Sequence, residues 1–154
     1  MTARLSRAVL VAAIALFYTL VVFNNLTDYG SNYEFVHHVL LMDSTLPGNH
    51  GMWRAIHSGW VYAAFYDGII LWEAATMALL WAGAVQLLRT GEKRTAVMGL
   101  TVGMLMWLTA FLTVGGEWFL MWQSHTWNGQ DAAFRMFVVL GVVMALVVLP
   151  ETKA

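Results

Sequence analysis

The chain has 154 residues, of which 60% are hydrophobic and 11% are charged, and its formal net charge is −1. A soluble domain of this length carries roughly 25% charged residues, so the composition indicates that lipid surrounds most of the chain. The sequence has no basic tail or basic block, which argues against nucleic acid as a partner. It contains no cysteine, which excludes disulfide bonds, thiolate catalysis and cysteine-ligated metal.

Four apolar segments are long enough to cross a membrane, which takes about 20 residues of helix. No small-x-small cleavage site follows the first segment, so we expect a retained anchor helix there rather than a cleaved signal peptide. The second and third segments exceed one span and should tilt or extend beyond the lipid. The expected spans are residues 8–26, 60–88, 95–122 and 133–149. This pattern predicts an all-α membrane protein, a four-transmembrane-helix bundle that forms a single domain over residues 1–154.

Basic residues are distributed unevenly about these spans. On the outer side we find only Arg54 and Arg135. The other side holds Arg4, Arg7, Arg89, Lys93, Arg94 and Lys153. Cytoplasmic loops carry the excess of lysine and arginine, so we expect the N- and C-termini in the cytoplasm.

The first outer loop, residues 24–59, is too long for a simple connection. Ser31 and Glu34 have the spacing of a capping box, and apolar residues follow them at roughly helical spacing. We therefore expect a short amphipathic helix in this loop, lying on the outer membrane face.

Three carboxylates, Asp67, Glu73 and Glu117, fall within the expected spans, where ionisable groups are costly and usually have a partner or a task. Counting about 1.5 Å per residue inward from the outer aromatic residues places Asp67 and Glu117 at about 8–10 Å depth and Glu73 at about 20 Å, near the midplane. Glu73 is either a protonated, hydrogen-bonded group or a proton-linked relay group.

A buried polar cluster is expected at the outer level. One interpretation is a satisfied knot that fixes helix register, with Arg135 neutralising one acid. Another is a small-molecule or ion pocket that opens outward, and a third is contact with a partner. The expected members are Asn24, Asn25, Asp67, Glu117 and Arg135.

The wall of this pocket or knot is expected to include the end of the third span. Gly115 and Gly116 would let a neighbouring helix or a ligand approach the backbone closely. Trp118 and Trp122 follow and mark the membrane interface. We expect all four residues to line the site.

All five histidines fall on the outer side. Histidine with carboxylate suits zinc, and histidine with methionine suits copper, but the spacing matches no known metal site. His37 and His38 are adjacent, so on a helix they point about 100° apart. The candidate metal ligands are His37, His38, His57 and His125. No nucleophile elbow or phosphate loop is present, so no catalytic residue is assigned and the cofactor stays undetermined.

Several stretches together resemble a known family. They are Phe23–Tyr29, Trp72–Ala74, Gly115–Gln123 and Trp127–Gln130. The combination is similar to the DUF2165 family of predicted small bacterial integral membrane proteins, over nearly the whole chain. The resemblance implies four spans in a bacterial inner membrane, and it implies no particular activity.

Three functional hypotheses follow. The small size, the lack of a catalytic constellation and the structured outer loop favour a non-enzymatic accessory or stabilising subunit that docks on a larger membrane complex, such as a respiratory or redox assembly. The second hypothesis is a small proton-linked transporter or channel that uses Glu73 and the outer acidic cluster. The third is a quinone-, lipid- or metal-binding redox protein. Expected partners are membrane lipid, another integral membrane complex or a second copy of the chain.

Overall fold

The computed structural model describes residues 2–150, and every regular element in that range is a helix. Four of its helices are long and apolar enough to cross a membrane, which confirms the expected fold class. The spans are α1 (Thr2–Thr27), α3 (Gly59–Arg89), α4 (Arg94–Leu105) with its π-helical continuation η2 (Met106–Trp118), and α5 (Gln130–Val148). The shorter elements are α2 (Tyr29–Leu41), η1 (Met52–Arg54) and η3 (Met121–Gln123).

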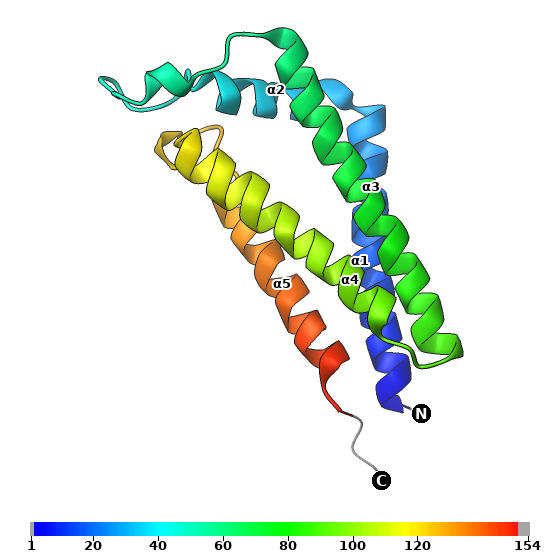
Figure 1. Ribbon diagram of the computed structural model, residues 1–154. Coiled ribbons are helices and arrows are strands. Elements are labelled where there is room, and N and C mark those ends of the chain that lie inside the picture. The colour runs from blue at the N-terminus through cyan, green and yellow to red at the C-terminus, as the bar shows by residue number, and fades with distance from the viewer. Residues whose placement is uncertain (1, 151–154) are drawn as a thin grey trace.

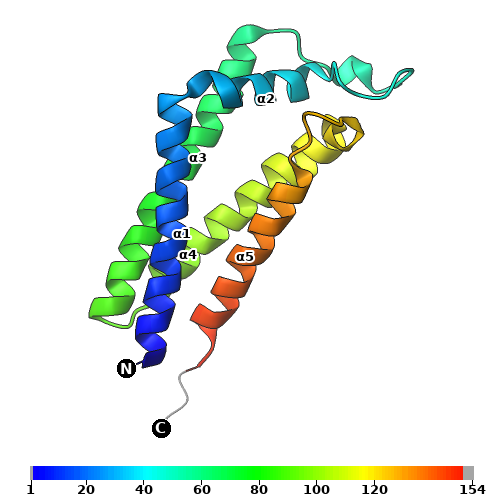
Figure 2. The same ribbon diagram turned by 180° about the vertical axis from the view of Figure 1, so that it is seen from behind.

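The spans form two pairs that enclose a V. Helix α1 packs along α3, and α5 packs along α4 and η2 (Figure 1). The pairs meet where α1 begins and α5 ends, which we call the closed end, and they diverge toward the other end, which we call the open end. The view from behind shows the same divergence (Figure 2). Helix α2 lies crosswise at the open end, beside the first turns of α3.

Small residues bring the helices together toward the closed end. A Cβ on Gly83 of α3 would lie 2.5 Å from the Cα of Ala96 in α4, so the two backbones are in direct contact. Gly99 faces Leu80, and Gly103 faces the hydroxyl of Tyr18. Close approach through small residues is the usual way in which helices pack in lipid. Glycine and alanine therefore set the close packing of the bundle near the closed end.

Basic side chains hold the helix ends at the closed end. Arg4 donates a hydrogen bond to the carbonyl of Leu87 near the end of α3, at 2.6 Å. Arg7 and Lys93 both donate to the carbonyl of Leu149 just after α5, at 3.0 and 2.7 Å. Carbonyls at a helix C-terminus lack intrahelical partners and carry partial negative charge, so these cations satisfy them.

The surface helix expected in the first outer loop is present as α2. Its buried residues Val36, Val39 and Leu40 belong to one apolar cluster with Tyr62 and Tyr66 of α3. The helix starts two residues before Ser31, whose hydroxyl donates to the Asp28 carboxylate at 2.7 Å. The capping-box position was therefore wrong, while the helix itself is confirmed.

The third span ends earlier than the sequence indicated. The amide of Phe119 donates to the carbonyl of Val114 at 3.0 Å, and the Thr113 hydroxyl donates to the carbonyl of Leu108 at 2.8 Å, both at the i to i−5 spacing of a π-helix. Leu120 then adopts a left-handed conformation, with φ of 54°, which ends the helix. The expected end at residue 122 was wrong because this turn cannot be read from hydropathy.

The contact at Gly83 makes a prediction about stability. Gly83→Ala should lower the free energy of unfolding by about 1–3 kcal/mol, because the new methyl group has no room against the α4 backbone. Unfolding in detergent micelles, followed by circular dichroism, measures the effect. Gly68→Ala on the same helix is the matched control, since nothing lies within 4 Å of a Cβ at that position. An equal loss at both positions would show that backbone contact is not the cause.

Candidate functional site

Glu73 is a buried carboxylate in the second span, with 3% of its surface exposed. The side-chain amide of Asn25, near the end of α1, donates to Glu73 Oε2 at 2.6 Å. The amide of Asn32, in α2, donates in turn to Asn25 Oδ1 at 2.7 Å. Within residues 2–150, Asn25 is the one hydrogen-bond donor to this carboxylate, and no cation pairs with it. A buried acid without a countercharge in a membrane segment is a functional-site signal.

Glu73 lies closer to the open end of the bundle than a count of residues along α3 alone suggests. Glu73 lies about 21 Å along α3 from its start, at about 1.5 Å per residue. Its partner Asn25 lies only two residues before the end of α1 at Thr27. The two facts agree because the first turns of α3 extend past the end of α1 and rise beside α2 (Figure 1). Glu73 is therefore level with the junction of α1 and α2.

Tyr66 adds a second buried polar group. It precedes Glu73 by seven residues, which is two helical turns, so both face the same side of α3. The residue is 2% exposed, and its hydroxyl has no hydrogen-bond partner, although Asn32 lies beside it. A buried hydroxyl without a partner costs about 1–3 kcal/mol, so a ligand or water that bonds to it would recover that energy.

A polar-walled cavity contains these groups. It has a volume of about 250 Å³, and we call it the polar cavity. Asn25, Asn32, Tyr66 and Glu73 line one part of its wall, and apolar side chains line the rest. These four polar side chains therefore border a space large enough for the polar head group of a ligand.

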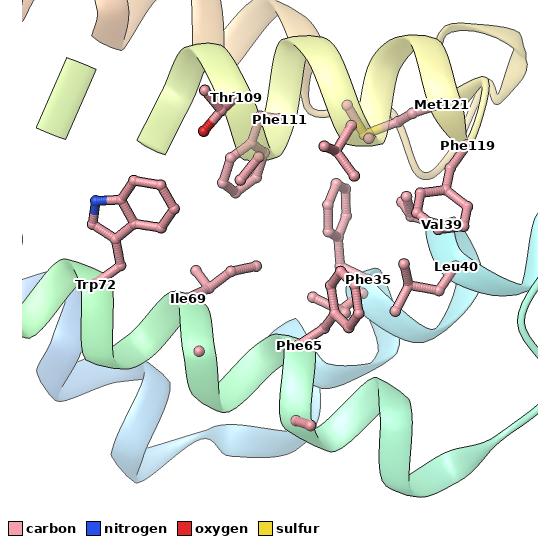
Figure 3. Close-up of a pocket in the computed structure, with 16 residues that line it drawn as sticks. Phe35, Val39, Leu40, Phe65, Ile69, Trp72, Thr109, Phe111, Phe119 and Met121 are labelled. Carbon is pink, nitrogen blue, oxygen red and sulfur yellow. The ribbon is translucent and has the colours of Figure 1, made fainter. Parts of the chain in front are cut away.

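A larger cavity of about 440 Å³ lies next to it between α2, α3 and η2, and we call it the apolar cavity. Figure 3 shows Phe35 of α2 pointing into the space between α3 and η2, with Ile69 and Trp72 on one side and Phe111 on the other. Four residues line both cavities, so the two are neighbours across a shared wall: Phe35, Val36, Ile69 and Phe111.

The apolar cavity offers no free polar side chain of its own. The indole N–H of Trp72 already donates to the carbonyl of Val102 at 3.0 Å, and the Thr109 hydroxyl donates to Leu105 at 2.7 Å. Two lining residues are substantially exposed, Phe65 of α3 at 44% and Val114 of η2 at 38%. The cavity therefore opens sideways between α3 and η2, on a surface that belongs in lipid.

The expected outer polar cluster is only partly assembled. Asn25 is buried, but it pairs with Glu73 and not with Asp67. Asp67 is exposed and accepts a hydrogen bond from the Tyr29 hydroxyl at 2.9 Å. Desolvation first, and then this bond to Asp67, raise the pKa of Tyr29 above its usual value, which keeps the hydroxyl a donor. Asn24 is exposed because adjacent residues on a helix point about 100° apart, so only one of the pair faces the core.

The last two expected members of the outer polar cluster do not form an ion pair. Glu117 and Arg135 are exposed, and the described residues contain no ion pair between Arg135 and either acid. Arg54 donates instead to the backbone carbonyl of Glu117 at 3.4 Å. The π-helical register of η2 shifts the direction of its last residues, so an α-helical count misplaced the Glu117 side chain.

The four residues expected to line the site have different environments. Gly115 lines the apolar cavity. A Cβ on Gly116 would lie 2.4 Å from the side-chain nitrogen of Gln130, so Gly116 packs against α5. Trp118 is exposed and lies under the Arg54 guanidinium, 5.5 Å from ring centroid to Cζ. Trp122 is exposed and lines neither cavity.

Two of the four candidate histidines meet on α2. His37 and His38 lie with Glu34 in one group whose ligand atoms are within 4.8 Å of one another. His57 and His125 are exposed and are not part of such a group.

The sequence did not reveal two polar residues of the site. Tyr66 shares a face with Glu73 at a spacing of seven residues, and that periodicity was a usable signal. The sequence gives no signal for Asn32, because Asn32 reaches Asn25 only through the change of direction between α1 and α2 at Asp28.

One comparison with known proteins identifies a family. The model of a family described as a predicted small integral membrane protein, DUF2165, matches residues 3–150. Neither a curated protein nor a solved structure matches the chain.

The hydrogen bond to Glu73 makes a second stability prediction. Asn25→Ala should destabilise the fold by about 1–3 kcal/mol, because it leaves the buried carboxylate without its donor. Thermal unfolding in detergent micelles measures the change. Asn24→Ala is the matched control, and as an exposed site it should change stability by less than about 0.5 kcal/mol. A loss at Asn24 as large as that at Asn25 would contradict the assignment.

Proposed function

The chain belongs to the DUF2165 family of small integral membrane proteins, and from this premise we propose that it binds an amphiphilic molecule taken from the membrane. The observation that carries the proposal is the shared wall between the apolar cavity and the polar cavity that contains Glu73. Ligand sites are typically apolar hollows of about 300–1,000 Å³ with a few convergent polar groups. This pair of cavities has that composition.

The polar groups indicate which chemistry the head of the ligand needs. The Tyr66 hydroxyl has no protein partner and can donate a hydrogen bond to a head-group oxygen. The Glu73 carboxylate receives one protein donor, from Asn25, and can accept a further hydrogen bond from a ligand hydroxyl. A head with a hydroxyl group, such as a quinol or a hydroxylated lipid, satisfies both.

The lateral opening supports uptake from lipid. Phe65 and Val114 flank the opening on α3 and η2. An acyl or isoprenoid chain could extend between them into the bilayer while the head lies near Glu73. Helix α2 covers the open end through Phe35, Val39 and Leu40, which separates the ligand from water.

Ligand retention tests this function. Purified protein should carry one amphiphile per chain, detected by native mass spectrometry and identified in an organic extract. Gly68→Leu should reduce retention at least tenfold, because Gly68 lines the apolar cavity with open space beyond its Cα and a leucine would fill it. Ala75→Leu is the matched control, since Ala75 is exposed on the same helix and lines neither cavity.

Two results would contradict the proposal. Wild-type protein with no bound amphiphile, both as purified and after incubation with the extracted membrane lipids, would refute the proposal. Equal retention by wild type and Gly68→Leu would show that the molecule binds elsewhere.

A second candidate is proton-linked transport through Glu73. The observation that favours it is the chain of hydrogen bonds from exposed Asn32 through Asn25 to Glu73. On the closed-end side, the next buried polar residue of α3 is Thr76, whose hydroxyl donates to the carbonyl of Trp72. The apolar cluster of Leu80, Leu87 and their neighbours follows. The hydrogen-bond chain reaches Glu73 from the open-end side, and the buried Tyr18 hydroxyl on the other side is bonded to Trp107 and not to Glu73, which fits binding better than conduction.

Flux measurements separate the two candidates. Transport through Glu73 predicts proton flux in liposomes that contain the protein and a pH-sensitive dye, and Glu73→Gln should abolish it, because glutamine is isosteric but cannot exchange a proton. Flux that is unchanged by Glu73→Gln would remove this residue from the mechanism. Binding without transport predicts no flux above that of empty liposomes for either protein.

We also propose the location and the docking role expected from the sequence. A bacterial inner membrane with the closed end facing the cytoplasm is supported by the arginines and lysine that satisfy the helix ends there. An accessory role on a larger membrane complex stays a prediction. Exposed aromatic side chains at the open end, Trp53 and Trp118, offer a surface for it.

A further inference from the structure

A second polar cluster lies on α2, away from the cavities. Glu34, His37 and His38 occupy positions i, i+3 and i+4 of this helix, so they share one turn. Both imidazoles approach the same carboxylate oxygen. Without an ion, His37 Nδ1 donates a hydrogen bond to Glu34 Oε2 at 3.1 Å, and His38 Nε2 lies 3.7 Å from the same oxygen. A bound metal ion would take the place of the His37 proton.

These distances fit a shared metal ion. Two donors bound tetrahedrally to one zinc ion at about 2.0–2.1 Å lie about 3.3–3.4 Å from each other. The two observed separations, 3.1 and 3.7 Å, lie on either side of that value. All three ligand atoms lie within 4.8 Å of one another, and the two stacked rings must rotate to direct their lone pairs at one ion.

The hydrogen bonding of His38 supplies an independent reason for a cation. Its Nδ1 lies 2.7 Å from Asp43 Oδ2, a carboxylate, so Nδ1 carries a proton and donates it. In the neutral ring the lone pair of Nε2 then faces the Glu34 carboxylate, and two acceptors face each other. A cation there, either a proton on Nε2 or a metal ion, removes that conflict. A carboxylate behind a histidine is also the usual outer partner of a metal-bound imidazole.

The backbone places Asp43 for this role. Helix α2 ends at Leu41, and Met42 adopts a left-handed conformation with φ of 57°. Few residues other than glycine take this conformation. Here it reverses the chain just enough for Asp43 to reach back to His38 on the last turn of the helix.

Aromatic stacking overcomes the divergence expected of adjacent histidines. The His38 ring stacks on Trp127, with ring centroids 4.5 Å apart and an angle of 11° between the planes. His37 packs at 4.8 Å against Tyr62 and at 5.0 Å against His38. These contacts hold both rings near Glu34 in advance, which lowers the cost of ordering them around an ion.

We propose that Glu34, His37 and His38 form a site for a divalent transition-metal ion, with zinc as the best fit, and that Asp43 orients His38 from behind. Imidazole and carboxylate ligands suit zinc, whereas magnesium and calcium prefer oxygen ligands alone. The cluster is partly exposed, so water completes the fourth position. None of the three ligand residues lines either cavity, so zinc binding does not require the amphiphile proposed above.

Zinc titration of detergent-purified protein tests the proposal. The protein carries no polyhistidine tag, is first treated with a chelator, and is titrated with Zn²⁺ against a fluorescent competitor. One ion should bind per chain, and a large excess of Mg²⁺ should not displace it. His38→Ala and Glu34→Gln should each weaken binding more than tenfold. Asp43→Asn should weaken it about 10–100-fold, as removal of an outer partner does.

His125→Ala is the matched control, because His125 is exposed and lies outside the cluster, and it should leave the zinc affinity unchanged. Binding of much less than one ion by the unmodified chain would overturn the proposal without any variant. Loss of affinity in His125→Ala equal to that in His38→Ala, with helicity by circular dichroism unchanged in both, would place the metal elsewhere.

Discussion

The hydrogen bond from Asn25 to Glu73 is the constraint on which the open end depends. Inside lipid there is no water to satisfy a carboxylate, so its partner must come from the protein. Asn25 provides that partner and sets the register between α1 and α3. Asn32 then satisfies Asn25 and ties the start of α2 to the same point. The crosswise position of α2 follows, and with it the cover of both cavities.

Other hydrogen bonds between helices lie near the level of Glu73. The helices pack differently on the two sides of this level. The indole of Trp107 in η2 donates to the Tyr18 hydroxyl in α1 at 2.9 Å, and Trp72 bridges α3 to α4. Toward the closed end, glycine and alanine let backbones touch. Toward the open end, Phe35 and Phe111 lie between the two helix pairs. Rings of this size keep α3 and η2 apart without filling the space, and the cavities are the result.

The features that could be predicted from sequence are those governed by local hydropathy. The four spans and the surface helix could be predicted from composition and length, and the resemblance to DUF2165 agreed with the spans. The partner of Glu73 could not be predicted, because it depends on how far α3 extends beyond α1. Depth was counted along each span without the offset between α1 and α3, and Asn25 was therefore grouped with Asp67. Glu117 was misplaced because its depth was counted from Trp122, whereas η2 ends at Trp118 and hydropathy does not mark that end.

Helix α2 connects the two proposed sites because its faces serve different chemistry. Phe35, Val39 and Leu40 line the apolar cavity, while His37 and His38 meet Glu34 on another face. An ion bound by the second face restrains the last turns of α2, and those turns also carry Val39 and Leu40. An amphiphile in the apolar cavity packs against the same residues of α2. Each ligand therefore favours the same position of one helix, and linkage requires that any such effect be mutual. Coupling of this kind needs no contact between the two ligands, because the position of α2 is the shared variable.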